Sequence, residues 1–155
     1  MPHPKIVASW LVAVSSAAAL TAAAQVVVAD AWVRGVVIGQ NTTGAFMQLK
    51  SPADTVLVGV ASPVARIVEI HAMKIDAGVM KMNAVARLSL PAGKAVELAP
   101  GGYHVMLMDL TRPIQQGDIV PLTLTFEDKG GTRQTVEVKA PVKPLNERGV
   151  APPRR

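Results

Sequence analysis

The sequence contains no cysteine, and this absence excludes several classes of protein at once. Without a thiol there is no disulfide framework, no thiolate zinc site, no iron–sulfur cluster, no thiol nucleophile and no blue-copper electron-transfer centre. A lipid-modified N-terminal cysteine is excluded for the same reason. Any soft metal site in this chain must therefore be built from methionine and histidine.

Aromatic and charged side chains are also scarce. Aromatics are 3% of the 155 residues and charged residues 17%, whereas half of the chain is apolar, so the core must be mainly aliphatic. The net charge of +5 is not gathered into a basic stripe with interleaved aromatics, so the sequence does not indicate a nucleic-acid-binding protein. Twelve glycines and twelve prolines favour frequent turns and short strands in a single domain.

Residues 1–24 have the layout of a secretory signal peptide. Lys5 is followed by an apolar run over 6–20 and by three alanines at 22–24, which resemble a cleavage site. A membrane anchor is the alternative, but the run is short and contains Ser15 and Ser16. We therefore expect export, cleavage near residue 25, no stable membrane insertion afterwards, and a periplasmic location in a bacterium with two membranes.

Short β-rich runs recur between turn signals through the rest of the chain. Alternation of apolar and polar residues, as in 122–126 and 136–139, is typical of strands with one face in water. The sequence predicts an all-β sandwich or barrel over 25–145, followed by a disordered, basic and proline-rich tail at 146–155. The expected strands are 26–37, 44–50, 55–61, 66–73, 79–83, 86–90, 94–98, 103–110, 119–127 and 133–139.

Histidine and methionine gather in one part of the predicted mature chain. All of them except Met47, which we expect in the core or at its periphery, fall between positions 71 and 108. Because side chains two residues apart share a face of a strand, they form three same-face sets. These sets are His71 with Met73, Met80 with Met82, and His104 with Met106 and Met108.

A hairpin connects the first two of these sets. If a four-residue loop at 75–78 is centred between Asp76 and Ala77, Met73 pairs with Met80 and His71 pairs with Met82. Directly paired Cβ atoms lie about 5 Å apart, close enough for two side chains to share one ion. Thioethers are soft, neutral ligands that suit Cu(I) and offer little to zinc, magnesium or calcium. Isolated methionines usually fill cores and isolated histidines are usually hydrogen-bonded, so the pattern leaves both interpretations open.

The spacing of four of these residues resembles a known signature, H-x10-M-x21-H-x-M, of the periplasmic copper chaperones called PCuAC. The matching residues are His71, Met82, His104 and Met106. The flanking strings are similar to the family as well: DAWVR at 30–34, GAFM at 44–47, VMKM at 79–82 and PGGYHVMLM at 100–108. The likeness extends over about residues 26–145, nearly the whole predicted mature chain.

The resemblance implies a cupredoxin-like β-sandwich or barrel with Greek-key-type topology that binds Cu(I). It implies His71, Met82, His104 and Met106 as ligands, and Met73, Met80 and Met108 as candidate auxiliary ligands. It also implies delivery of copper to the CuA site of cytochrome c oxidase, through an oxidase subunit or an assembly factor. Some family members hold Cu(II) in a tail rich in histidine and methionine, but residues 109–155 contain neither residue.

Three functions follow as hypotheses. The first is a metallochaperone, not an enzyme, that passes Cu(I) to an acceptor by ligand exchange. The second is a periplasmic protein for copper sequestration or resistance, and the third is a β-sandwich interaction module without metal. Only two histidines remain after signal cleavage, and both belong to the candidate metal site, so a Ser–His–Asp triad is not expected.

Overall fold

The computed structural model describes residues 25–146, and this part of the chain is built from ten strands with no helix. Each predicted run corresponds to one strand, with boundaries shifted by a few residues at most ends. The predicted signal peptide, and the predicted tail apart from Asn146, lie outside the described residues. The strands are β1 (Val27–Arg34), β2 (Thr42–Lys50), β3 (Thr55–Ala61), β4 (Ala65–Asp76), β5 (Val79–Ala84), β6 (Leu88–Leu90), β7 (Ala95–Leu98), β8 (Tyr103–Leu110), β9 (Ile119–Asp128) and β10 (Arg133–Lys143).

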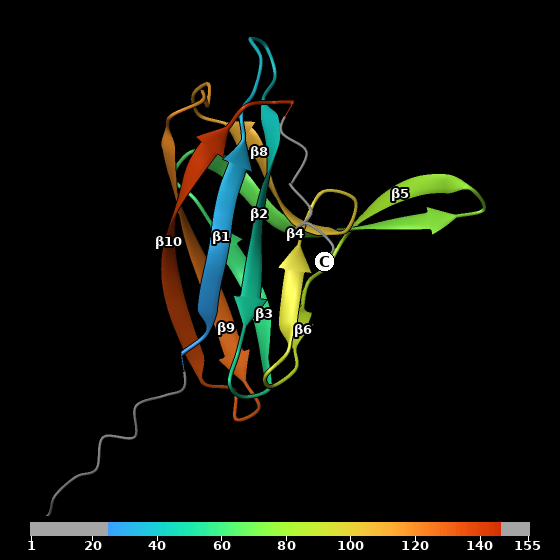
Figure 1. Cartoon of the computed structure of the whole chain (residues 1–155), viewed down its shortest axis with the longest axis vertical. Coiled ribbons are helices and arrows are strands. Elements are labelled where there is room, and N and C mark those ends of the chain that lie inside the picture. Colours follow the sequence, from blue (N-terminus) through green and yellow to red (C-terminus); the bar gives the residue numbers. More distant parts are fainter. Residues whose placement is uncertain (1–24, 147–155) are drawn as a thin grey trace, which may run out of the picture.

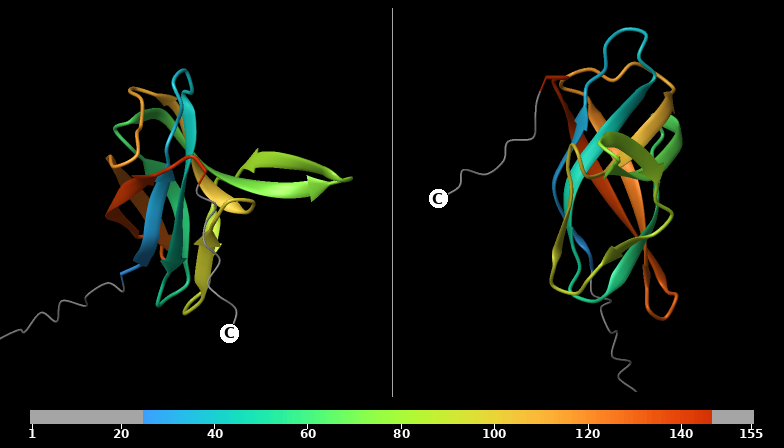
Figure 2. Two further views of the ribbon diagram at one scale, coloured as in Figure 1. Left: turned by 45° about the horizontal axis from the view of Figure 1, so that its top comes forward. Right: turned by 90° about the vertical axis from the view of Figure 1, so that its right-hand side faces the viewer.

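The strands form two layers that share an edge (Figures 1 and 2). One layer has the order β5-β4-β8-β7-β2-β1, with β8 also paired to β2, and the other has the order β10-β9-β3-β6. A short parallel pairing of β1 with β10, at Val33–Val142 and Arg34–Lys143, joins the layers. The chain crosses repeatedly from one layer to the other, so both layers are built from strands distant in sequence. The predicted all-β sandwich is confirmed.

An aliphatic core fills the space between the layers. Along β9 every second side chain is fully buried, and its neighbours point to solvent, as the alternating sequence predicted. Met47 on β2 is only 2% exposed and belongs to this core, as predicted. The largest fully buried side chains are Phe126, Met47, Leu49, Leu57, Leu90, Leu98, Leu107, Ile114, Leu122 and Leu124. The single phenylalanine among them agrees with the low aromatic content.

The β4–β5 hairpin projects from the sandwich as an arm (Figures 1 and 2). β4 pairs with β8 only as far as Ala72, and beyond that point its sole partner among the described strands is β5. Every residue of β5 is exposed. The turn consists of Ala77 and Gly78, with φ of 49° and 78°. Two positive φ angles are typical of the type I′ turn, whose twist matches that of a two-residue hairpin.

This turn makes the predicted hairpin register wrong. Met73 pairs with Met82, not Met80, and His71 pairs with Ala84, not Met82. The tight turn is centred between Ala77 and Gly78, one position later than the assumed loop, so every pairing shifts by two residues. Because the side-chain period of a strand is also two, the shift leaves the same side chains on the same face.

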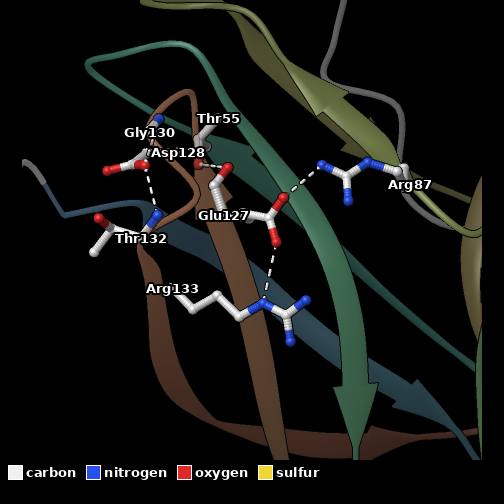
Figure 3. A network of polar contacts seen from close by, with 7 residues as sticks. All are labelled: Thr55, Arg87, Glu127, Asp128, Gly130, Thr132 and Arg133. Atoms are coloured by element: carbon white, nitrogen blue, oxygen red, sulfur yellow. Dashed lines mark hydrogen bonds and ion pairs between the residues drawn. The ribbon is translucent and has the colours of Figure 1, made fainter.

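A polar network lies beside the β9–β10 turn (Figure 3). The Glu127 carboxylate on β9 accepts hydrogen bonds from Arg87 at 2.8 Å and from Arg133 at 3.0 Å. Both guanidinium groups lower the pKa of Glu127. The hydroxyl of Thr55 on β3 donates a hydrogen bond to the backbone carbonyl of Glu127. The network thus ties β3, β9 and β10 to the segment before β6, the edge strand of its layer.

Candidate metal centre

Three adjacent strands bring the predicted metal-binding residues to one face of the first layer. β4 lies between β8 and β5. His71 on β4 is paired directly with His104 on β8, and Glu69 with Met106. On the other side of β4, Met73 is paired with Met82 on β5. Directly paired residues project from the same face, so these side chains form one surface.

The opposite face of the same strands is core. Ile70 on β4 and Val105 and Leu107 on β8 belong to the core between the layers, and Ala72 on β4 is buried as well. The alternation of these strands therefore places the apolar set inward and the histidine and methionine set outward. Met106 also lies opposite Gly44 on β2, a residue with no side chain to cover it.

A pocket of about 350 Å³ opens on this outer face. Met82, His104 and Met106 line it together with Met73. The rest of the wall comes from Arg34, from the loop before β8, and from β2 with the segment before it, including Phe46. His71 is not part of the lining but lies beside it, with its ring centre 5.9 Å from that of His104. The structure thus gathers all four residues of the sequence signature around one pocket.

His104 is held in one orientation. Its ring is buried, and Nδ1 lies 3.1 Å from the carbonyl oxygen of Gly102. A carbonyl only accepts hydrogen bonds, so Nδ1 carries the hydrogen and Nε2 of the neutral ring keeps a free lone pair. Burial lowers the pKa of His104, and the nearby His71 and Arg34 lower it further, against an opposing effect of the Gly102 hydrogen bond. His104 is therefore a neutral imidazole with Nε2 available for a metal.

His71 offers the other ring nitrogen. Its Nε2 lies 2.8 Å from the Glu69 carboxylate, an acceptor, so Nε2 carries the hydrogen in the neutral ring. Nδ1 of His71 is buried and has no hydrogen-bond partner. A buried nitrogen without a partner costs free energy unless something binds it. A carboxylate behind a metal-binding histidine is a common arrangement that fixes the ring and increases its basicity.

The low pKa of His104 gives a prediction for pH titration. As pH falls, we expect His104 to stay neutral below the value of about 6.5 typical of an unperturbed histidine. The unfolded chain binds this proton first, so the effect lowers stability progressively as pH falls below that value. Long-range ¹H–¹⁵N NMR spectra of the metal-free protein against pH measure both the tautomer and the titration. An Nε2–H tautomer, or protonation at or above the ordinary value, would contradict the assignment.

The three candidate auxiliary ligands differ in their position relative to the pocket. Met73 lines the pocket, whereas Met80 and Met108 do not. Met80 lies further out on the arm, paired with Ile75 and 56% exposed. Met108 pairs with Ile67 on β4, two residues beyond Met106 along β8. Among residues 25–146, no group of three or more His, Cys, Asp or Glu residues could hold a metal ion.

Sequence reasoning missed several residues that shape the site. The Glu69 carboxylate is hydrogen-bonded to the His71 ring. Its position two residues before His71, on the same face of the strand, could have indicated this contact from the sequence. The Phe46 ring packs at a tilt against Trp32, with ring centres 4.6 Å apart, and its centre lies 6.4 Å from that of the His104 ring. The Arg34 guanidinium lies 5.2 Å from the Phe46 ring centre. Trp32 and Arg34 lie on β1 and Phe46 lies on β2, far from the histidines in sequence.

A family model described as "Putative lipoprotein LpqE-like" matches residues 26–142 of the chain. The chain belongs to the LpqE-like family. The protein Lxx21020 of Leifsonia xyli subsp. xyli, also described as a lipoprotein, is 34% identical over 115 residues. This match covers 72% of the chain and 68% of the relative.

Solved structures similar to this LpqE-like protein include two copper-bound proteins. One is the solution structure of CuI-DR1885 from Deinococcus radiodurans, with 34% identity, a TM-score of 0.62, and coverage of 83% of this chain and 85% of that one. Another is the copper-bound PCuAC domain from PmoF2, with 27% identity, a TM-score of 0.61, and coverage of 77% and 92%. The predicted cupredoxin-like fold class is confirmed by this likeness.

Proposed function

We propose that this protein is an extracytoplasmic copper chaperone that binds Cu(I) at the pocket and releases it to an acceptor by ligand exchange. The ligands are His71, Met82, His104 and Met106. One observation carries the proposal: two thioethers and two imidazoles from three strands meet around one pocket. The copper-bound PCuAC domain and CuI-DR1885, whose folds this chain shares, support the same function.

The donor set favours Cu(I) over harder ions. Thioether sulfur is neutral and polarisable, and an imidazole with a free lone pair accepts the same ion. Both histidines already have one ring nitrogen hydrogen-bonded, which leaves Nε2 of His104 and Nδ1 of His71 for the metal. Because all four donors are neutral, no proton has to leave when copper binds to the neutral rings. The site also avoids thiols, which oxidise readily outside the cytoplasm.

Release follows from the weakness and exposure of the methionine ligands. Met82 is 46% exposed, so an approaching protein reaches the pocket from the arm side. In the exchange, a thiolate of the acceptor forms a bond to Cu(I) as a thioether or imidazole leaves, and the next thiolate repeats the step. The product has soft anionic ligands in place of neutral ones, and this difference drives the transfer.

The location and the acceptor complete the proposal. The leader-like residues 1–24 and the lipoprotein descriptions of the relatives support a place outside the cytoplasm, the periplasm in a bacterium with two membranes. Since the sequence has no cysteine, we propose a soluble form without a cysteine-linked lipid. The acceptor is a copper-receiving subunit of cytochrome c oxidase for its CuA site, or an assembly factor of that oxidase. No enzymatic activity is proposed.

The proposed function is tested by copper loading and transfer with the purified mature protein. We expect one Cu(I) per chain under reducing conditions, with sulfur and nitrogen neighbours in X-ray absorption spectra. When the copper-loaded protein is mixed with a dithiol peptide, we expect the Cu(I) to move to the peptide. A chain that takes up no Cu(I) would favour an interaction module without metal. A chain that binds Cu(I) but does not release it to thiolates would favour copper sequestration.

A further inference from the structure

We propose that Met73 is a direct Cu(I) ligand, so that the site has three thioethers rather than two. This inference rests on the proposed function and adds a residue to the ligand set of the same site. It starts from the position of Met73 on β4, between the strand that carries the histidine–methionine pair His104 and Met106 and the strand that carries Met82.

The spacing of strands makes this middle position important. Neighbouring strands lie about 4.8 Å apart, so β5 and β8 are separated by about 10 Å across β4. An ion bound by both Met82 and His104 must therefore lie over β4. The β4 residue paired with Met82 is Met73, whose side chain projects from the same face. His71, the other β4 donor, is paired with His104 in the next row of the sheet.

The opposite neighbour of Met73 is Gly102, which leaves room above β8. The backbone N–H of Met73 donates to the Gly102 carbonyl at 3.2 Å. The same carbonyl accepts from Nδ1 of His104 at 3.1 Å. One oxygen thus fixes both the backbone of Met73 and the orientation of the His104 ring. Since Gly102 has no side chain, nothing from that residue stands between the Met73 thioether and the imidazole.

Pocket geometry separates Met73 from the other methionines outside the signature. Met73 lines the pocket with Met82, His104 and Met106, whereas Met80 does not, although it lies on the same face of the arm. With His71 beside the pocket, the site holds five donors, more than a Cu(I) ion binds at once, so Met73 binds the ion in exchange with the other four. A surplus donor lets one thioether hold the ion as another departs, so Met73 aids transfer as well as binding.

The test compares three single leucine variants of the mature protein. Met73→Leu and Met82→Leu should each weaken Cu(I) binding by about tenfold or more, since even indirect contacts to metal ligands contribute that much. Each should also lower the sulfur coordination seen in X-ray absorption spectra. The matched control is Met80→Leu on the same face of the same hairpin, which should keep the wild-type affinity within about twofold. Affinity is measured by competition with a colorimetric Cu(I) chelator.

A second measurement uses the unaltered protein and avoids any effect on folding. With ¹³C-labelled methionine methyl groups, the resonances of Met73, Met82 and Met106 should all shift on addition of one Cu(I), and that of the buried Met47 should not. A wild-type affinity and unchanged sulfur coordination in Met73→Leu, or a Met73 methyl that does not shift, would overturn the inference. Failure of the wild-type chain to bind Cu(I) would instead refute the proposed function.

Discussion

Replacing Met82 and Met106 together by leucine is expected to lower Cu(I) affinity by more than about 100-fold, the loss that a single supporting residue of a metal site already reaches. Leucine removes the sulfur but keeps similar volume and apolar character. Met82 is largely exposed on the arm and Met106 is half-buried at the pocket, so neither change opens a cavity in the core. The fold should survive, because Leu–Met exchanges usually cost less than about 1.5 kcal/mol even in cores.

Both properties are measured on the same double variant. Chelator competition gives the Cu(I) affinity, and thermal unfolding of the metal-free protein gives the stability. A double variant that keeps wild-type Cu(I) affinity would falsify the assignment of these two thioethers as ligands. If stability fell sharply while the wild-type chain also bound no copper, the methionines would be packing residues instead.

The reverse result is expected for Met47. Truncation of this fully buried side chain to alanine should lower the free energy of unfolding by about 2–5 kcal/mol, through lost apolar contact and the cavity left behind. Met47 lies on β2 opposite Leu98 of β7, on the core side of the layer that carries the pocket. The Cu(I) affinity of the folded variant should stay within a few-fold of the wild type.

Met80→Ala is the matched control for this change. Met80 is 56% exposed at the outer part of the arm, so its truncation should alter stability by no more than about 0.5 kcal/mol. Chemical denaturation of Met47→Ala, Met80→Ala and the wild type at one pH gives the comparison. Equal stability of Met47→Ala and the wild type would show that the β2–β7 region is less tightly packed than the structure indicates.

The sequence predicted the fold class and the faces of the strands well. Along β9, apolar and polar residues alternate because the strand meets the core on one side and water on the other, and along β8 side chains two residues apart share one face. This local rule placed Val105 and Leu107 inside and His104 with Met106 on one outer face. It also survived the wrong hairpin register, since a shift by two residues changes the partners but not the face.

The exact partners depended on geometry that no local pattern contains. A loop of four residues and a turn of two both fit the sequence between Lys74 and Val79. The turn that forms depends on positive φ at Ala77 as well as at Gly78, and alanine gives no signal for this conformation. This turn sets the register of the hairpin, in which Met73 is paired with Met82. Side chains that share a face could be predicted, but their nearest neighbours could not.

The sequence by itself determined the chemistry available to this protein, and the tertiary structure decided which side chains can act together. Because the chain lacks cysteine, any site for a soft metal ion must use its histidines and methionines, which gather in one part of the sequence. Pairing of β4 with β8, by contrast, joins His71 to His104 across 33 positions of the chain. Such long-range pairing is settled by burial of both layers around one core, a property of the whole sandwich rather than of any segment.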